Sequence, residues 1–355
     1  MSEKYFLGCM TQQGFSTEFG RLMETGGRFT YILKGGPGTG KSSLMKRAAA
    51  EFEKTEHVVR FYCSSDPASL DAVMLESSGV LIVDGTAPHV FDPIYPGIRQ
   101  KIIDLGSHWD ERILAENSES IIAVTDRNKS LHARSKRFSV ALSNVLNDTF
   151  NCAMGCIDEE KLEGFLTRSC KKILAGKGRG QGLRELRQLA AMTEFGMMTM
   201  TETLESYQDI IILRDDNYAC AHTICERTAQ EAMRRGYDVI LCPAHGLNNT
   251  AYEHLLIPET GTALVSVTPM NDLDITAEKQ INLARFYDKS AAARYRGRLK
   301  MNKTTAAGLA DEVYATIRSA KAVHDEIEKY YIEAMDFEAV EKQTEQIIAE
   351  IRARN

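Results

Sequence analysis

The chain of 355 residues contains no apolar run that approaches the length of a membrane span, and its net charge is −6. It lacks the basic excess that attracts nucleic acids or anionic membrane surfaces, so we expect neither as a partner. Its first six residues, Met-Ser-Glu-Lys-Tyr-Phe, lack the charged and apolar regions of a signal peptide. These absences predict a cytoplasmic protein. The length allows two domains of ordinary size.

The eight cysteines include no C-x-x-C pair, which argues against a zinc or redox motif. Cys152 and Cys156 form a C-x₃-C pair, but no His or Cys pair at zinc-finger spacing follows it. We therefore expect free thiols that pack as small apolar side chains in a reducing compartment.

A glycine-rich segment lies between a short apolar run and a helical pattern. Residues 35–42 read Gly-Gly-Pro-Gly-Thr-Gly-Lys-Ser and match the spacing G-x-x-x-x-G-K-[ST] of a phosphate-binding loop. Residues 29–33 predict a strand, and residues 43–51 have the apolar spacing of a helix. A loop between a strand and a helix N-terminus presents backbone N–H groups to an anion. The segment therefore predicts a nucleotide-binding site.

Each residue type in this loop has a chemical reason. Glycines let the backbone turn with positive φ and approach a phosphate closely. Lys41 would neutralise the β- and γ-phosphates, and the hydroxyl of Ser42 would ligate Mg²⁺. The expected ligands are ATP and Mg²⁺. The predicted phosphate-binding residues are Gly35, Gly36, Pro37, Gly38, Thr39, Gly40, Lys41, Ser42 and Ser43.

A carboxylate ligand for the metal, beside the hydroxyl of Ser42, is predicted at Asp84, which ends the apolar run 81–83. A P-loop site needs such an acid at a strand end to hold Mg²⁺, although Asp-Gly is also a turn signal. The next residue is Gly85, where ATPases that hydrolyse quickly commonly place a Glu. This departure favours slow hydrolysis, phosphotransfer to another acceptor, or a base from elsewhere in the chain.

Candidates for that base follow at the same expected sheet edge, where ligands of α/β proteins bind. His89 and Asp92 could orient water or accept a proton, which would make them catalytic together with Lys41 and Asp84. The alternative is a turn histidine and a capping aspartate. Residues 64–66, Ser-Ser-Asp, leave the neighbouring predicted strand and are candidates for substrate contacts.

The chain repeats itself at domain length. Met10 aligns with Met192 and Ile103 with Ile281, so the spacings are 182 and 178 residues. Similar spacings between these points indicate duplication of a unit of about 180 residues rather than a solenoid. Residues 1–175 form the predicted first half with the phosphate loop, 176–186 a Gly-rich basic linker, and 187–355 the second half. The alternative for the linker is that its cations reach a bound phosphate.

Each half alternates strands with helices, which is typical of a parallel sheet with crossover helices. Residues 118–150 alternate three- and four-residue apolar spacing, which favours a long helix over a fourth strand at 120–124. Further helices are predicted over 158–174 and 337–352, and a stripe over 313–330 repeats the long one. The predicted fold is α/β, with tandem duplicated P-loop NTPase-like units. Each unit is expected to have a small, mainly parallel sheet, flanking helices and a helical hairpin.

The second half is predicted to have lost the phosphate site. Residues 215–222, Asp-Asp-Asn-Tyr-Ala-Cys-Ala-His, replace the loop, and Ser266 replaces Asp84. No glycine or lysine remains there, and two aspartates would repel a phosphate. We therefore expect a pseudo-domain, and Arg214 or Arg227 are its nearest cations by alignment.

Four segments together resemble an uncharacterised family of bacterial, largely Firmicute, P-loop ATPases with two related halves. They are residues 34–43, 63–71, 84–89 and 92–97. The resemblance covers essentially the whole chain and implies ATP binding, but not a physiological substrate. The second half departs from the P-loop pattern.

Three functions stay open at this point. The first is a slow ATPase, a hydrolase with one active and one degenerate half, whose cycle moves the helical hairpins to act on an unknown protein. The second is a small-molecule or nucleotide kinase. The third is a non-enzymatic nucleotide sensor. The sequence leaves open ATP against GTP, the acceptor, the source of any arginine finger and the oligomeric state.

Overall fold

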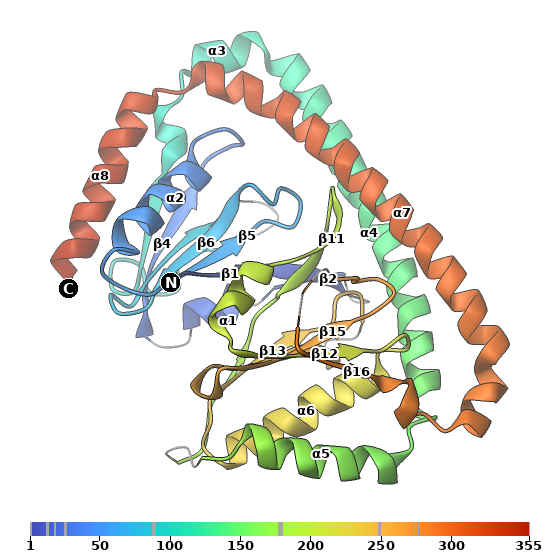
Figure 1. The fold of residues 1–355 in the computed structure, drawn as a ribbon. Helices are drawn as coiled ribbons and strands as arrows, with labels where there is room; N and C mark the ends of the chain where they lie inside the picture. Colours follow the sequence, from blue (N-terminus) through green and yellow to red (C-terminus); the bar gives the residue numbers. More distant parts are fainter. Residues whose placement is uncertain are drawn as a thin grey trace. The chain divides into compact units, whose positions relative to one another are not determined.

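The computed structural model describes residues 2–11, 14–17, 19–24, 27–86, 90–176, 180–247, 250–273, 275 and 277–354. Their contacts divide the chain into two compact units (Figure 1). Unit 1 comprises Met1–Leu7, Thr17–Arg134 and Ala315–Asn355, and unit 2 comprises Gly8–Ser16 and Ser135–Tyr314.

Unit 1 contains a six-stranded mixed sheet. Its order is β1 (Ser2–Phe6), β5 (Val58–Tyr62), β6 (Leu70–Leu75), β7 (Val80–Asp84), β4 (Phe29–Lys34) and β8 (Gln100–Asp104). Strand β6 pairs antiparallel with both neighbours, and the other pairs are parallel. The sequence prediction missed β6, although all six of its residues are buried. The segment between the predicted strands is therefore part of the sheet rather than a connection.

One face of this sheet is covered by α2 (Lys41–Phe52) and α8 (Phe337–Arg354), which lie side by side (Figure 1). Alternating residues of β4 point to this face because side chains of a strand alternate. The buried core joins strand, α2 and α8 residues, among them Phe29, Tyr31, Leu33, Leu44, Met45, Ala48, Val340, Ile347 and Ile351. The remaining elements are α1 (Phe19–Glu24), η2 (Leu105–His108), α3 (Glu111–Glu116), the start of α4 (Ser118–Met154) and the end of α7 (Lys289–Ala334).

Unit 2 repeats the sheet of unit 1. Its order is β9 (Arg184–Leu186), β13 (Val239–Pro243), β14 (Tyr252–Ile257), β15 (Thr262–Val267), β12 (Asp209–Arg214) and β16 (Lys279–Asn282). Again only the third strand, β14, pairs antiparallel with its neighbours. The order and directions match those of unit 1 strand by strand. The two units therefore share one mixed α/β topology.

Helices α5 (Glu159–Ile173) and α6 (Ala219–Arg234) pack together in unit 2 (Figure 1). Its other elements are the two-stranded sheets β2 (Gly8–Thr11) with β3 (Gly14–Thr17) and β10 (Ala190–Thr193) with β11 (Gly196–Thr199), and η3 (Thr201–Ser206), η4 (Pro258–Thr260) and η5 (Leu283–Phe286). Residues 184–186, which the sequence assigned to the linker, form β9. Residues 177–179 of that linker lie outside the described residues.

A pair of backbone hydrogen bonds fastens the α7–α8 corner to the core of unit 1. The N–H of Asp110 donates to the carbonyl of Ala334 (2.7 Å), and the N–H of Asp336 donates to the carbonyl of His108 (2.9 Å). The core partners come from the first half of the sequence and the corner from the second. The second half therefore supplies the helix that covers α2.

Unit 2 has the same pair of backbone hydrogen bonds, which we call the latch, with the roles of the two sequence halves exchanged. The N–H of Asp288 donates to the carbonyl of Cys156 (2.7 Å), and the N–H of Asp158 donates to the carbonyl of Phe286 (2.8 Å). Each of these four residues stands 178 positions from its counterpart in unit 1. In each unit, a corner between two helices from one half of the sequence is thus hydrogen-bonded to a segment from the other half.

Several sequence predictions are confirmed at the level of secondary structure. The long helices, the strand before the glycine-rich loop and the helix after it form as expected. The predicted boundaries 1–175, 176–186 and 187–355 follow the internal sequence repeat, whereas the two units are defined by contacts in the structure. These boundaries stay a prediction. Seven cysteines are free thiols: Cys63, Cys152, Cys156, Cys170, Cys220, Cys225 and Cys242. Among the described residues, no helix has the length and apolar character needed to cross a membrane.

His245, which follows β13, provides a test of unit 2 through pH. Both ring nitrogens are buried without a hydrogen-bond partner among the described residues, and burial lowers the pKa of His245 from 6.5 to about 4. Between these values the unfolded chain binds a proton that the folded chain does not, so the free energy of unfolding decreases as pH falls from 6.5 to 4. A difference of about 2.5 pKa units corresponds to about 3 kcal/mol.

We expect His245→Leu to flatten this decrease, measured by urea unfolding with circular dichroism at several pH values. His57→Gln is the matched control, since a hydrogen bond to Glu76 raises the pKa of His57 and cannot cause a loss of stability in acid. Identical pH profiles for the wild type and His245→Leu would contradict the assignment.

Candidate functional site

The glycine-rich loop connects the end of β4 to the start of α2 in unit 1. Gly35, Gly38 and Gly40 have φ values of 144°, 69° and 88°, which side chains with a Cβ rarely adopt. A Cβ at Gly35 would also lie 2.8 Å from Oγ1 of Thr39. Helix α2 begins without a side-chain cap and without an acidic residue in its first turn. Its first N–H groups are thus not capped by a side chain at the N-cap position.

Lys41 lies inside the loop rather than in solvent. Its side chain is buried, and Nζ donates hydrogen bonds to the carbonyl oxygens of Gly36 (2.6 Å) and Gly35 (3.2 Å). Nζ is also 3.8 Å from Oδ2 of Asp84. Because β4 and β7 are parallel neighbours, their carboxyl ends bring these two residues together. The structure therefore juxtaposes a cation and a carboxylate that are 43 residues apart in the sequence.

The two predicted metal ligands are both hydrogen-bonded to nearby backbone. Oγ of Ser42 accepts from the N–H of Leu70 at 3.0 Å. Oδ1 of Asp84 accepts from the N–H (2.9 Å) and the hydroxyl (2.6 Å) of Thr86. Oδ2 of Asp84 faces Lys41. Among the described residues, no group of three or more His, Cys, Asp or Glu side chains is arranged as a metal site. Water molecules and phosphate oxygens would complete any Mg²⁺ shell at this position.

Gly85 has a steric reason to be glycine. A Cβ there would lie 2.4 Å from Cγ2 of Ile32, and the N–H of Gly85 donates to the carbonyl of Leu33 (2.9 Å). Nζ of Lys34 fastens the same segment through the carbonyls of Gly85 (2.7 Å) and Phe91 (2.8 Å). A glutamate after Asp84 would therefore require displacement of the β4 core.

The other candidate site residues are not shown in contact with Lys41 or Asp84. His89 lies outside the described residues, and Asp92 is exposed. Asp66 accepts from the N–H of Ala68 (3.2 Å) and the hydroxyl of Ser69 (2.8 Å), as a turn-capping aspartate does. Its Oδ2 is 3.8 Å from Nζ of Lys321.

Sequence reasoning missed the helix that lies against the loop. A Cβ at Gly36 would be 2.8 Å from Cε1 of Tyr331, and one at Gly38 would be 3.0 Å from both the carbonyl oxygen of Glu328 and Cγ1 of Ile332. The apolar stripe over 313–330 predicts a helix but does not indicate its partner. The close approach requires glycine at both loop positions.

In unit 2 the corresponding loop is filled by its own carboxylate. Asp215 accepts from the N–H groups of Asn217 (3.0 Å) and Ala221 (2.9 Å), and the hydroxyl of Tyr287 donates to both of its oxygens (2.9 and 3.1 Å). Burial raises the pKa of Asp215. Tyr218, with φ 68°, replaces a glycine at the start of α6. The carboxylate occupies the place where a phosphate loop would present its N–H groups.

The two aligned arginines are engaged within unit 2. Nη1 of Arg227 is 2.9 Å from Oε2 of Glu159, and Nε of Arg214 donates to Oε1 of Gln280 at 3.1 Å. These partners belong to α5 and to β16, so both guanidinium groups have structural contacts of their own.

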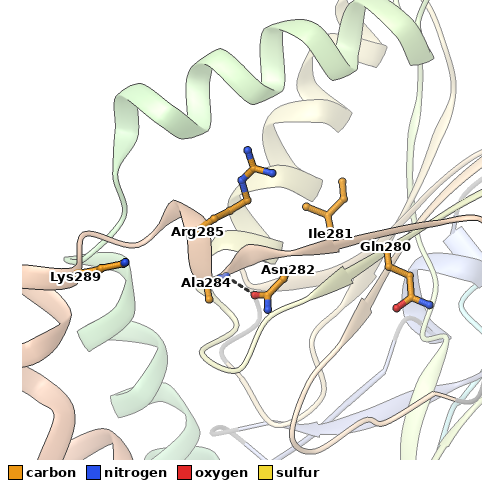
Figure 2. Close-up of a pocket in the computed structure, with 6 residues that line it drawn as sticks. All are labelled: Gln280, Ile281, Asn282, Ala284, Arg285 and Lys289. Carbon is orange, nitrogen blue, oxygen red and sulfur yellow. Dashed lines mark hydrogen bonds between the residues drawn. The ribbon is translucent and has the colours of Figure 1, made fainter.

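Figure 2 shows a separate hollow of about 430 Å³ in unit 2. Its lining comes from β16, η5 and the start of α7: Gln280, Ile281, Asn282, Ala284, Arg285 and Lys289. Oδ1 of Asn282 accepts from the N–H of Ala284 and so caps η5. The hollow contains no predicted site residue and no carboxylate, histidine or cysteine among those lining residues.

Comparisons of the chain with family models, curated proteins and solved structures found no significant match. The resemblance to two-half P-loop ATPases therefore stays a prediction.

The packing at Gly85 gives a direct test of the site's architecture. We expect Gly85→Ala to lower the free energy of unfolding by about 1–3 kcal/mol, since its Cβ overlaps Ile32 in a packed core. In an Ile32→Ala background the same change should cost much less, which a double-mutant cycle measures. Gly297→Ala, where no atom lies within 4 Å of the added Cβ, is the control. Equal costs in both backgrounds would show that the two residues are not in contact.

Proposed function

We propose that unit 1 binds a nucleoside triphosphate, with ATP and Mg²⁺ as the expected ligands, and hydrolyses it slowly. The observation that carries the proposal is the buried Lys41, whose Nζ donates to the carbonyl oxygens of Gly35 and Gly36 and lies 3.8 Å from Oδ2 of Asp84. A helix start without a side-chain cap at its N-cap adds backbone donors for an anion. The resemblance to two-half P-loop ATPases supports the same reading.

In this proposal, separate residues bind the phosphates and the metal ion. The loop 35–43 would surround the phosphates with N–H groups, and Lys41 would exchange its carbonyl partners for phosphate oxygens. Ser42 and Asp84 would hold Mg²⁺, which supplies charge neutralisation when bound. Asp84 is already oriented by Thr86, so its remaining oxygen points to the loop.

The steric exclusion of a glutamate at Gly85 favours slow hydrolysis. The same observation favours a second candidate, phosphotransfer to a small molecule or nucleotide, because a kinase needs no water-orienting residue at this position. Release of inorganic phosphate without an acceptor would distinguish the ATPase from the kinase. A non-enzymatic sensor, the third candidate, would bind without turnover. The ATPase candidate also involves a protein partner, and the kinase candidate a phosphate acceptor, and neither is identified.

We expect the wild-type chain to bind one ATP, and Lys41→Ala to weaken that binding at least ten- to hundred-fold. A charge-assisted hydrogen bond contributes about 1.5–3 kcal/mol, which sets this range. Isothermal titration calorimetry measures both affinity and stoichiometry. Lys46→Ala, which changes an exposed lysine of the same helix, is the matched control.

A stoichiometry near two would contradict the assignment of unit 2 as a domain without a phosphate site. Unchanged ATP affinity in Lys41→Ala would show that the nucleotide does not bind at this loop.

We expect Asp84→Asn to abolish most of the Mg²⁺ dependence of ATP binding, since an amide is a poorer metal ligand than a carboxylate. ATP affinity measured over a magnesium titration tests this. Asp126→Asn, which changes an exposed aspartate of α4, serves as the control and should leave the titration unchanged. If Asp84→Asn and the wild type gave the same curve, the metal role would belong to another acid.

A further inference from the structure

In unit 2, η5 and the first part of α7 carry a concentration of positive charge. Residues 285–303 include seven Lys and Arg side chains and one acidic residue, Asp288, which gives a net charge of +6. The chain as a whole has a net charge of −6. A local field extends over a Debye length of about 8 Å at physiological salt, so distant acidic residues do not cancel this charge.

Four of these cations form a row on one side of α7. They are Lys289, Arg296, Lys300 and Lys303, and all four are exposed. Because an α-helix has 3.6 residues per turn, the residues seven, eleven and fourteen positions after Lys289 return to its side of the helix. The rise per residue gives the row a length of about 21 Å. We call these four residues the basic row.

The basic row begins at the hollow in Figure 2. Lys289 lines this hollow together with Arg285 of η5. Gln280 and Asn282 add amide groups, and no carboxylate is among the lining residues. Gln280 also accepts from Nε of Arg214 (3.1 Å), so a third cation contacts a lining residue. The hollow therefore favours an anionic group at one end of the row.

The cations of the basic row are accessible, whereas their neighbour Arg298 is engaged in the fold. Nε of Arg298 donates to Oδ2 of Asp148 (2.7 Å) and so joins α7 to α4. Within the part of the chain that the structure describes, one member of the row forms an ion pair. Nζ of Lys303 lies 3.9 Å from Oδ2 of Asp216, and both side chains are exposed. Exposed pairs of this kind contribute little to stability, so the row remains free to bind a ligand.

The first half of the sequence shows that a long helix at this position does not need the charge. Counterparts stand 178 positions earlier, because the latch residues at both ends of the segment keep this spacing. Residues 107–125, the counterpart of 285–303, contain one Arg and four acidic residues, a net charge of −3. The counterparts of Arg285 and the basic row include no Lys or Arg: they are Ser107, Glu111, Ser118, Ile122 and Thr125. Helix packing therefore does not explain the cations of unit 2.

The backbone of a nucleic acid duplex fits this surface better than an acidic protein does. Protein interfaces have an apolar centre and charges at the rim. The exposed large apolar residues of this part of α7 are Tyr295 and Met301, and neither stands three, four or seven residues from a member of the basic row. The lack of an aromatic side chain in the row also argues against a single strand, which binds largely through base stacking. A duplex backbone requires only cations.

We infer that the basic row and the adjoining hollow form a surface in unit 2 that binds the phosphate backbone of a double-stranded nucleic acid without regard to base sequence. The basic row contacts successive phosphates, and Arg285 holds a further phosphate at the hollow. Binding is electrostatic and weakens steeply with salt, because each phosphate contact releases condensed counterions. The inference does not rest on the proposed nucleotide site, since these residues belong to unit 2.

Fluorescence anisotropy of a labelled DNA duplex of about 20 base pairs measures binding to the full-length chain over a range of salt concentrations. With four or five phosphate contacts, log Kobs should fall with log salt with a slope of about −4. We expect the double variant Arg296→Gln, Lys300→Gln to reduce this slope to about −2 and to weaken binding about tenfold at low salt.

The matched control is the double variant Arg294→Gln, Lys46→Gln. It removes the same charge from two exposed cations outside the basic row and should bind like the wild type. Lys41→Ala should also bind the duplex like the wild type, so failure of the ATP proposal is distinguishable from failure of this one. Circular dichroism verifies folding. If the basic-row variant does not fold, Lys289→Glu, which introduces the residue of the first half, replaces it with an expected slope change of at least about one.

The outcomes decide between the possible ligands. No binding of the duplex at about 50 mM salt, or equal salt slopes for the wild type and the basic-row variant, would overturn the inference. Tighter binding of a single strand of equal length would overturn it in favour of single-stranded nucleic acid. Displacement of the duplex by poly-glutamate as readily as by unlabelled duplex would assign the surface to an acidic protein. A loss of slope confined to the basic-row variant supports the inference.

Discussion

The backbone N–H groups where the glycine-rich loop meets α2 are the constraint on which much of unit 1 depends. A helix start without a side-chain cap needs acceptors from elsewhere, since unpaired N–H groups are costly when buried. Here the N-cap residue is Gly40, which has no side-chain oxygen to accept from them. Three glycines of the loop have positive φ, a conformation in which backbone N–H groups can surround an anion. The loop's sequence thus makes an acceptor of negative charge favourable at this position.

The two units differ in whether the loop itself contains a carboxylate. In unit 2, Asp215 belongs to the loop itself and is buried under the hydroxyl of Tyr287. In unit 1, residues 35–42 contain no Asp or Glu, and the side chain of Lys41 lies inside the loop. A carboxylate within the loop cannot leave without unfolding the turn, whereas a loop without one can accept an external anion. The difference gives a physical reason for expecting binding in one unit alone.

The sequence predicted the local parts of this arrangement well. The loop, its flanking strand and helix, and the long helices depend on short-range spacing, which a sequence displays directly. Strand β6 was missed because a short buried run between turns has no periodicity that separates a strand from a connection. The approach of Glu328 to Gly38 could not be predicted, because about 290 residues separate them and no local pattern indicates the contact. The steric exclusion at Gly85 likewise depends on Ile32, a neighbour across the sheet.

The repeated pair of backbone hydrogen bonds makes part of the second half of the sequence an integral part of unit 1. Cys156 and Asp158 of the first half form backbone hydrogen bonds within unit 2. Ala334 and Asp336 of the second half form the equivalent bonds within unit 1. Helix α8 and the end of α7 therefore cover α2 and the glycine-rich loop although they belong to the second half of the sequence. Removal of that half would expose the apolar face that α2 shares with Val340, Ile347 and Ile351. Unit 1 thus requires helices of the second half whether or not that half binds a phosphate.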